Sequence, residues 1–143
     1  MAQDQMIRSF YDAVNSRDFE KFTSFFSDDG KFKDMSSDRV FSGKKEIREM
    51  ADAWMKAISD VKLQVLNVIG SGDDYSVELA LTGTHDGTLS TPMGDFPASG
   101  KKVDVPSSDR IHLKNGKIQW LNCYFAAPVL LSQIGAMQSK KAA

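Results

Sequence analysis

The segment Lys101–Phe125, KKVDVPSSDRIHLKNGKIQWLNCYF, decides the fold because it has the pattern of a long β-hairpin. Asn115-Gly116 lies near its middle, and this dipeptide is the strongest short signal for a two-residue hairpin turn. Every second residue before the turn falls on one face, which is apolar apart from a serine and Asp109. We therefore predict strands over Lys101–Leu113 and Ile118–Phe125.

Two further strands are predicted before this hairpin. Apolar and polar residues alternate from Val61 to Val65 and again from Tyr75 to His85, as they do in half-buried strands. Between these segments, the run Gly70–Asp74 has the composition of a turn. The segment Thr88–Gly100 contains two prolines and two glycines, so we expect it to be a long irregular connection.

The first part of the chain is predicted to be helical. An apolar stripe recurs at three- and four-residue spacing and consists of Met6, Ile7, Phe10, Tyr11 and Val14. Asp18 is placed to cap a second, phenylalanine-rich helix. Asp28-Asp29-Gly30 is expected to end that helix before a short strand over Lys31–Asp34.

Two more helices are predicted from their first residues. Ser42 has the character of an N-cap, and the apolar spacing that follows extends to Ile58. Pro128 can open a terminal helix that reaches Met137, because proline is well tolerated in the first turn.

Helices followed by long consecutive strands favour the α+β class, with a curved antiparallel sheet that bends around the N-terminal helices. The last strand is apolar on both faces, with Ile118, Trp120 and Tyr124 assigned to one and Leu121, Cys123 and Phe125 to the other. A sheet face in water should be polar, so the terminal helix or a second subunit should cover this one. We favour a homodimer that buries the outer face of the sheet.

Length and composition indicate one domain. The chain has 143 residues, of which 41% are hydrophobic and 26% charged, as is usual for a globular protein. We assign residues 1–138 to a single domain and residues 139–143 to a frayed tail. The large apolar side chains, with nine Phe and seven Met among them, exceed what a thin core needs and indicate a lined cavity.

Charge and cysteine content argue against several classes of protein. The 18 basic and 19 acidic residues form no basic stripe, so we predict no nucleic-acid partner. One cysteine allows no internal disulfide, and no histidine–carboxylate set has metal-ligand spacing, so we predict neither a metal nor another cofactor. No apolar run is long enough to span a membrane, and the first residues lack the apolar core of a secretion signal. We therefore expect a cytoplasmic protein without a membrane partner.

Several motifs, taken in order along the chain, resemble one family. They are Gly43–Ile47, Thr82–His85, Gly94–Lys101, Asn115–Ile118 and Leu130–Gly135. Together they are similar to the SnoaL-like polyketide cyclases of the NTF2-like superfamily. The resemblance implies an NTF2-like cone with a pocket for a small apolar molecule.

The resemblance also implies where catalytic groups should stand, and here the chain departs from the pattern. The usual catalytic aspartate of the SnoaL-like proteins would fall at Ala126, which cannot transfer a proton, and their common tryptophan would fall at Asn122. The more distantly similar ketosteroid isomerases have a proton-abstracting carboxylate that would match Asp34 and an oxyanion-hole acid that would match Asp109.

One donor of the isomerases has no direct counterpart. Their oxyanion-hole tyrosine on the first helix would fall at Phe10. Tyr11 or Tyr124 would therefore have to replace that hydroxyl group.

The residue pattern itself singles out Asp109, because this carboxyl group shares a strand face with apolar residues and should point inward. Burial disfavours its charge, and a neutral carboxylic acid can donate a hydrogen bond to a developing oxyanion. The alternative is a buried aspartate that is bonded to backbone amides or to a nearby serine.

Asp34 ends its predicted strand near the expected mouth of the pocket. There a carboxylate could act as a general base on a carbon acid. Alternatively, Asp34 caps a turn with Ser36 and Ser37.

We assign other side chains to substrate binding. His85 could line the pocket and shuttle protons, or serve as a structural histidine at a strand end. Asn122 and Tyr124 share a strand face and could orient a carbonyl oxygen, or form a cross-strand polar pair. Three aromatic residues are assigned either to the pocket wall or to ordinary core: Phe10, Tyr11 and Trp54.

Two functions compete on this basis. In the first, an isomerase or cyclase transfers a proton on a small apolar carbonyl compound, with Asp34 as the base and Asp109 as the stabiliser of the enolate. In the second, the chain is a non-catalytic module that binds a hydrophobic ligand or serves as a dimeric scaffold. A protein-interaction domain is a weaker third reading.

Overall fold

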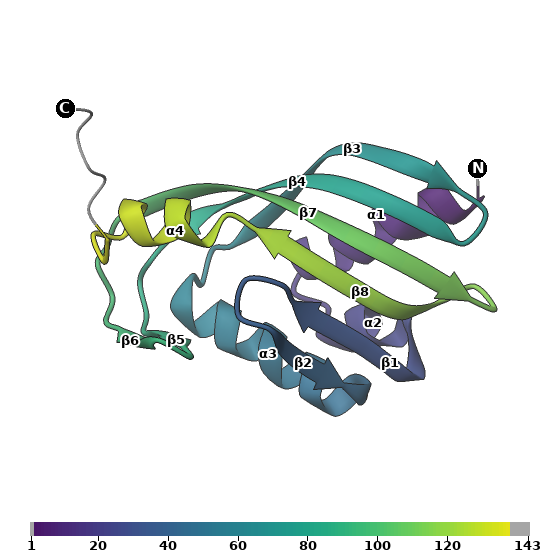
Figure 1. Cartoon of the computed structure of the whole chain (residues 1–143), viewed down its shortest axis with the longest axis horizontal. Coiled ribbons are helices and arrows are strands. Elements are labelled where there is room, and N and C mark those ends of the chain that lie inside the picture. Colours follow the sequence, from purple (N-terminus) through teal and green to yellow (C-terminus); the bar gives the residue numbers. More distant parts are fainter. Residues whose placement is uncertain (1, 138–143) are drawn as a thin grey trace.

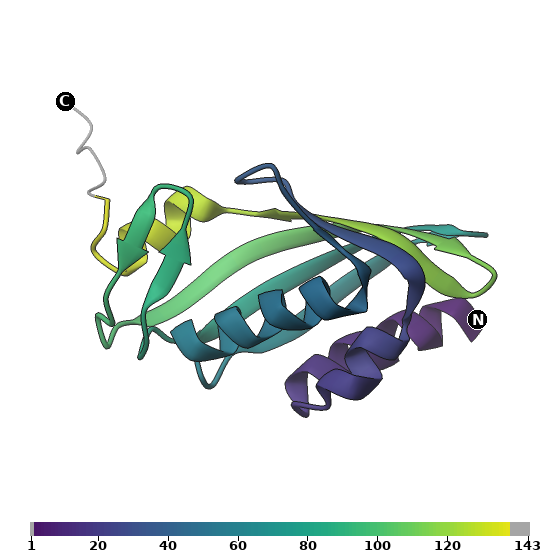
Figure 2. The ribbon, with the colours of Figure 1, turned by 90° about the horizontal axis from the view of Figure 1, so that it is seen from below.

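Within residues 2–137, which the computed structural model describes, six strands form one curved sheet, and helices lie against its concave side (Figures 1 and 2). The helices are α1 (Ala2–Asn15), α2 (Phe19–Ser24), α3 (Gly43–Ala57) and α4 (Ala127–Gln133). The strands of the large sheet are β1 (Phe26–Asp34), β2 (Arg39–Ser42), β3 (Lys62–Ser71), β4 (Asp74–Thr84), β7 (Lys102–Lys114) and β8 (Lys117–Phe125).

The sheet has the strand order β2-β1-β8-β7-β4-β3. Neighbouring strands are antiparallel except β1 and β8, which run parallel. The predicted α+β class, with N-terminal helices inside a curved sheet and a short C-terminal helix, is confirmed. Strand β1 follows the helices α1 and α2 along the chain and is not joined to β8 by a hairpin. These two strands can therefore pair in parallel.

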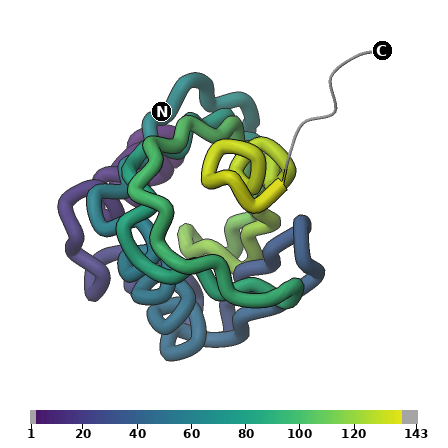
Figure 3. Tube along the Cα trace, turned by 90° about the vertical axis from the view of Figure 1, so that its left-hand side faces the viewer, coloured from purple at the N-terminus to yellow at the C-terminus, as the bar shows by residue number. Residues whose placement is uncertain are grey.

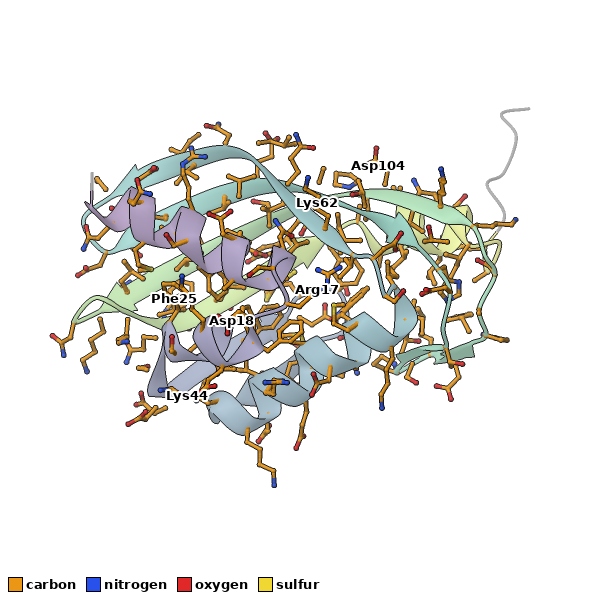
Figure 4. The ribbon with its side chains drawn as sticks, turned by 180° about the vertical axis from the view of Figure 1, so that it is seen from behind. Arg17, Asp18, Phe25, Lys44, Lys62 and Asp104 are labelled. Atoms are coloured by element: carbon orange, nitrogen blue, oxygen red, sulfur yellow. The ribbon has the colours of Figure 1, made fainter. Side chains whose placement is uncertain are left out.

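The link between α1 and α2 follows the predicted capping. The Asp18 carboxylate accepts a hydrogen bond from the backbone N–H of Lys21 at 3.0 Å, which satisfies a free donor of the first turn. Arg17, just before it, has a positive φ of 65°, so the chain reverses sharply between the two helices. Figure 4, viewed from the helical side, labels both residues.

The predicted end of α2 was wrong. The helix ends at Ser24, and Asp28-Asp29-Gly30 lies within β1. The reason is Phe26, which is fully buried and pairs with Ile118, so the strand begins there. The register shifts between Phe26 and Lys31, and this bulge accommodates Asp28 and Asp29 at the surface while Gly30 is buried.

The other helix boundaries followed the prediction in part. Ser42 is the N-cap of α3, but its backbone N–H donates to the Glu46 carboxylate at 3.2 Å while its own side chain makes no capping bond. Pro128 lies in the first turn of α4 as predicted. Met137 falls outside that helix, and the predicted tail 139–143 lies outside the described residues.

The main hairpin forms as predicted, whereas the irregular connection contains structure. Asn115 and Gly116 both have positive φ, 54° and 75°, which matches the twist of the flanking strands β7 and β8. The segment expected to be irregular carries a second, two-stranded sheet made of β5 (Leu89–Thr91) and β6 (Gly94–Phe96).

The facing of residues along β8 was wrong at its start. His112 pairs with Trp120, but the next residue, Leu113, pairs with Ile118, so Gln119 is an extra residue in a β-bulge. The bulge moves Ile118 onto the inner face, where it is fully buried together with Leu121. If alternation continued unbroken from Ile118, Trp120 and every second residue after it would also face inward. Because of the bulge, these residues face outward instead.

Two clusters of buried side chains fill the space between sheet and helices. One is centred on α1 and the middle of the sheet, and the other lies near α4 and the end of α3. Trp54 and Leu63 pack against both clusters. Among residues 2–137, no helix is both long enough and apolar enough to cross a membrane.

Candidate active site

A mostly apolar cavity of about 110 Å³ lies between the sheet and the helices α1, α2 and α3. Its walls come from aromatic and aliphatic side chains on all three helices and on the strands β1, β2, β3, β4, β7 and β8. Its lining includes a few polar side chains, namely Tyr11, Asp34, Arg39, Ser107 and Asp109. Such a lining suits an apolar ligand that is oriented by few polar contacts.

Asp109 lies on β7 at the side of this cavity. Alternation along β7 turns it inward as predicted, and it is only 4% exposed. The Tyr11 hydroxyl group donates a hydrogen bond to Asp109 Oδ2 at 2.6 Å. Asp109 Oδ1 is buried and has no hydrogen-bond partner among the described residues. One carboxyl oxygen is therefore held by Tyr11, and the other is buried without a hydrogen-bond partner in the described part of the chain.

The electrostatic environment of Asp109 follows from this burial. Loss of hydration raises the pKa of Asp109 to about 6, although interactions with Tyr11 and Cys123 lower it in part. The pKa of the Tyr11 hydroxyl group is well above its usual value, because burial and the adjacent Asp109 both disfavour a phenolate. Near neutral pH, Tyr11 is thus a hydrogen-bond donor and Asp109 is mainly ionised.

Helix α1 holds Tyr11 in position through Asn15, one turn further along the same helix. The Asn15 side chain donates to the backbone carbonyl of Leu63 and accepts from the backbone N–H of Leu63, both at 2.8 Å. This pair of bonds joins the end of α1 to strand β3. It fixes the helix relative to the sheet that carries Asp109.

Asp34 also lines the cavity, but its oxygens are occupied. Oδ1 accepts from the Ser36 hydroxyl and backbone N–H groups at 2.6 and 2.9 Å, and Oδ2 accepts from the Ser37 hydroxyl group at 2.7 Å. The Arg39 guanidinium lies 3.7 Å from Oδ2. The turn-capping alternative therefore describes these contacts, although Asp34 is buried and not solvated.

Phe10 and Trp54 both belong to the cavity wall. The Phe10 ring lies 4.9 to 5.8 Å from the rings of Tyr11, Phe22, Phe25 and Phe26. The Trp54 ring meets Phe125 edge to face at 5.6 Å. Aromatic pairs of this kind resist displacement and keep the cavity walls in place.

Asn122 and Tyr124 do not contribute to the cavity, which corrects the prediction. They pair across the sheet with Arg110 and Ser108 on the outer face, and Tyr124 is 49% exposed. Their strand neighbour Cys123 lies directly opposite Asp109 and faces inward.

His85 is likewise absent from the cavity lining. The chain leaves the large sheet after Thr84, so His85 lies beyond the strand that was expected to direct it inward. It is 1% exposed, and its Nδ1 accepts from the backbone N–H of Ser99 at 3.2 Å. The structural alternative describes this histidine.

Several lining residues were not predicted as site residues. Ser107 and Cys123 share the inward face with Asp109, and alternation along the two strands could have identified both. Arg39 had no detectable signal, because it reaches the cavity only through the unpredicted strand β2. Within residues 2–137, no group of three or more His, Cys, Asp and Glu side chains is arranged to hold a metal ion.

Comparison with known proteins places this geometry among related folds. The family model of SnoaL-like polyketide cyclases matches residues 5–121. AclR from Streptomyces galilaeus superposes with a TM-score of 0.81 at 18% identity, over 98% of this chain and 85% of AclR. TsrD from Streptomyces laurentii gives 0.81 at 19% identity, over 96% of this chain and 98% of TsrD.

A third solved structure connects the fold to the isomerases. A protein from Catenulispora acidiphila, described as having a ketosteroid isomerase-like fold, superposes with a TM-score of 0.77 at 16% identity, over 95% of this chain and 96% of that protein. These likenesses confirm the predicted NTF2-like fold, and at such identities they concern the fold alone. A search of curated proteins found no match to the sequence.

Proposed function

This chain belongs to the SnoaL-like polyketide cyclase family, and from that premise we propose that it binds a small, largely apolar carbonyl compound and transfers a proton on it without a cofactor. One observation carries the proposal: a buried aspartate, one of whose oxygens has no hydrogen-bond partner within residues 2–137, lines an apolar cavity that otherwise has few polar groups. A carboxylate in such surroundings is a stronger base than one in water, because burial disfavours its charge.

Asp109 is the proton-transfer group in this proposal. With a pKa of about 6, most Asp109 side chains are ionised at neutral pH, so the base form is the abundant one. The Tyr11 hydroxyl group holds Oδ2, which leaves Oδ1 to take the proton. This reverses the expectation that Asp109 acts as a neutral donor while Asp34 abstracts the proton.

Asp34 takes a positioning role here. Three hydrogen bonds and the nearby Arg39 engage both of its oxygens, so neither is left to approach a ligand proton. It instead fixes the turn between β1 and β2 and holds Arg39 at the cavity.

The proposed step is balanced without any other reactant. Asp109 takes a proton from the carbon next to the ligand carbonyl, and the C–H electrons form the C=C bond of an enolate while the carbonyl oxygen gains the negative charge. In this proposal the hydroxyl group of Ser107, which lines the cavity on the same strand face, donates a hydrogen bond to that oxygen. If the ligand has a C=C bond one carbon beyond, the enolate is a dienolate, and return of the proton from Asp109 to its γ-carbon completes an isomerisation. In a cyclisation, the enolate carbon attacks a second carbonyl of the ligand, and Asp109 returns its proton to the alkoxide that forms.

A binding module without catalysis is the second candidate. Ala126 favours it, because this residue stands where the resemblance places the usual catalytic aspartate, and it does not line the cavity. In that case the apolar walls would hold a ligand and Asp109 would only orient it.

Hydrogen–deuterium exchange separates the two candidates without knowledge of the natural substrate. In D2O, the enzyme should accelerate exchange of the methyl protons of acetophenone, as followed by NMR, and Asp109→Asn should reduce the protein-catalysed rate by about 10²-fold or more. Asp12→Asn, an exposed change on α1, is the control. Binding of acetophenone without protein-dependent exchange would favour the binding module.

We also propose that the outer sheet face joins two copies of the chain. Lys31, Trp120, His112 and Asp74 form one row across the sheet from β1 to β4. A two-fold axis that is parallel to the strands and lies between β7 and β8 would place Lys31 over Asp74 of a second copy and Trp120 over His112. Charge and aromatic contacts would then be self-complementary, as a two-fold interface requires.

The expected cytoplasmic location stays a prediction, which cell fractionation would test.

A further inference from the structure

A wide groove of about 1030 Å³ adjoins the inner cavity. Its walls come from α3, the β5–β6 hairpin, α4 and the turn between β1 and β2, which surround the end of the molecule seen in Figure 3. Cavity and groove share a collar of lining residues, namely Asp34, Arg39, Phe41, Met50, Trp54 and Phe125. The two spaces are thus neighbours that meet at these side chains.

The two spaces differ greatly in size. The inner cavity, at about 110 Å³, is on the scale of the small apolar cavities that accept a single benzene ring. The groove is about the upper size of ordinary ligand pockets. A ligand that places its reacting carbonyl near Asp109 can therefore bury about one ring inside, and any further part must pass the collar into the groove.

The groove also differs in chemistry from the cavity. Hydroxyl groups of Ser90 and Thr91 line it on one side, and the carboxylates of Glu46 and Glu49 line it on the α3 side. Lys56 is the basic side chain among its lining residues apart from the collar Arg39, which already faces Asp34. A negatively charged group would meet an excess of acidic side chains there.

We infer that the site takes a two-part ligand, with one apolar, carbonyl-bearing ring in the inner cavity and a polar extension without negative charge in the groove. The inference rests on the proposed function for the position of the ring, and it adds the length and the charge of the rest of the ligand. Affinity should then depend on the groove even though the groove takes no part in proton transfer.

The test compares acetophenone with acetophenones that carry a para-linked tail, using NMR titration of the protein. A methoxy-di(ethylene glycol) tail or a trimethylammonium tail should tighten binding about tenfold relative to acetophenone. A carboxylate tail of equal length should bind at least about threefold more weakly than the ammonium tail. Absence of any gain from the tails would overturn the inference.

Variants locate the effect in the groove. Ala53 lines the groove but not the inner cavity, so Ala53→Trp should abolish the gain from the tails and leave acetophenone affinity unchanged. Ser90→Trp blocks the opposite wall and should do the same. Lys45→Trp, on the same helix but absent from both linings, is the matched control and should change neither affinity.

The outcomes also separate this inference from the proposed function. If Ala53→Trp and Ser90→Trp weaken acetophenone and the tailed ligands alike, the two-part site is wrong although proton transfer stands. If acetophenone shifts no resonance of cavity residues while the tailed ligands bind, the proposed function fails at the inner cavity.

Discussion

Burial of Asp109 favours its protonated form over its carboxylate form. The same burial makes the carboxylate a candidate base. In the unfolded chain its pKa returns to roughly 3.9, whereas in the folded protein it is about 6. The folded state therefore binds a proton more readily than the unfolded state between these values. Stability should fall as pH rises through this window and stay low above it.

Asp109→Asn removes this titration and keeps an acceptor for Tyr11. Below about pH 4, the wild-type carboxyl group is protonated in both the folded and the unfolded state. The variant should therefore be little more stable than the wild type there. Above about pH 6.5, the variant should be more stable than the wild type by up to ~3 kcal/mol, which follows from about two pKa units. Urea unfolding at a series of pH values measures the difference. A stability difference that does not change between pH 4 and pH 7 contradicts the assigned burial.

The inward position of Asp109 could be predicted, because alternation along one strand needs only local sequence. Its partner could not, since Tyr11 lies 98 residues away and meets it only when α1 packs on the sheet. For Asp34, the sequence left two interpretations open, a general base at the pocket mouth and a cap of the turn that follows. Only the hydrogen bonds of Ser36 and Ser37 show that both oxygens are occupied.

At the scale of elements, the contact between α1 and β3 sets where Tyr11 lies. Asn15→Ala removes both bonds to Leu63 and should lower the free energy of unfolding by about 1–3 kcal/mol. The same change should slow acetophenone exchange, because Tyr11 is no longer held against Asp109. Asp12→Ala, exposed on the same helix, should change neither quantity. An Asn15→Ala protein of reduced stability but full exchange rate would show that α1 is positioned by other contacts.

Strands with clear alternation were predictable, and irregular ones were not. The pattern of β7 is unbroken over its whole length, and its inward face is buried throughout. In β8, the extra residue Gln119 reverses the facing of all later residues, and nothing in the local pattern marks it. This single bulge is the reason that Cys123, and not Asn122 or Tyr124, lies on the face that lines the cavity.

Strand β2 was missed because it is short and its burial is incomplete. It exists through pairing with β1, from Lys31 opposite Ser42 to Asp34 opposite Arg39. This pairing brings Arg39 to the cavity. Because β2 was not predicted, Arg39 was not predicted as a site residue either.

At the scale of the whole molecule, the proposed two-fold contact through the outer sheet face predicts a dimer. Sedimentation velocity at micromolar concentration should show about twice the mass of one chain. Tyr124→Arg, which adds a charge to an exposed ring on this face, should shift the protein towards monomer without change in its circular dichroism. Met93→Arg, exposed on the β5–β6 turn, should leave the dimer intact. A wild-type protein that sediments as a monomer would exclude the proposed interface.

The order of the helices and of the long strands was predictable from the sequence, whereas the short strands β2, β5 and β6 were not. An inward acid beside a lined cavity was also predicted. The size of that cavity and its separation from a wider groove were not, because both depend on how α3, α4 and the β5–β6 hairpin pack around the open end of the sheet. The volumes of the side chains alone do not predict where a cavity remains.

The most direct test of the account is a ¹³C NMR titration of the Asp109 carboxyl group, with Asp109→Asn used for assignment. The account predicts a midpoint near 6 in the free protein and a change of chemical shift when acetophenone is added. A midpoint near 4 that acetophenone leaves unaltered would mean that the carboxyl group is hydrated and remote from any ligand, which would contradict the account.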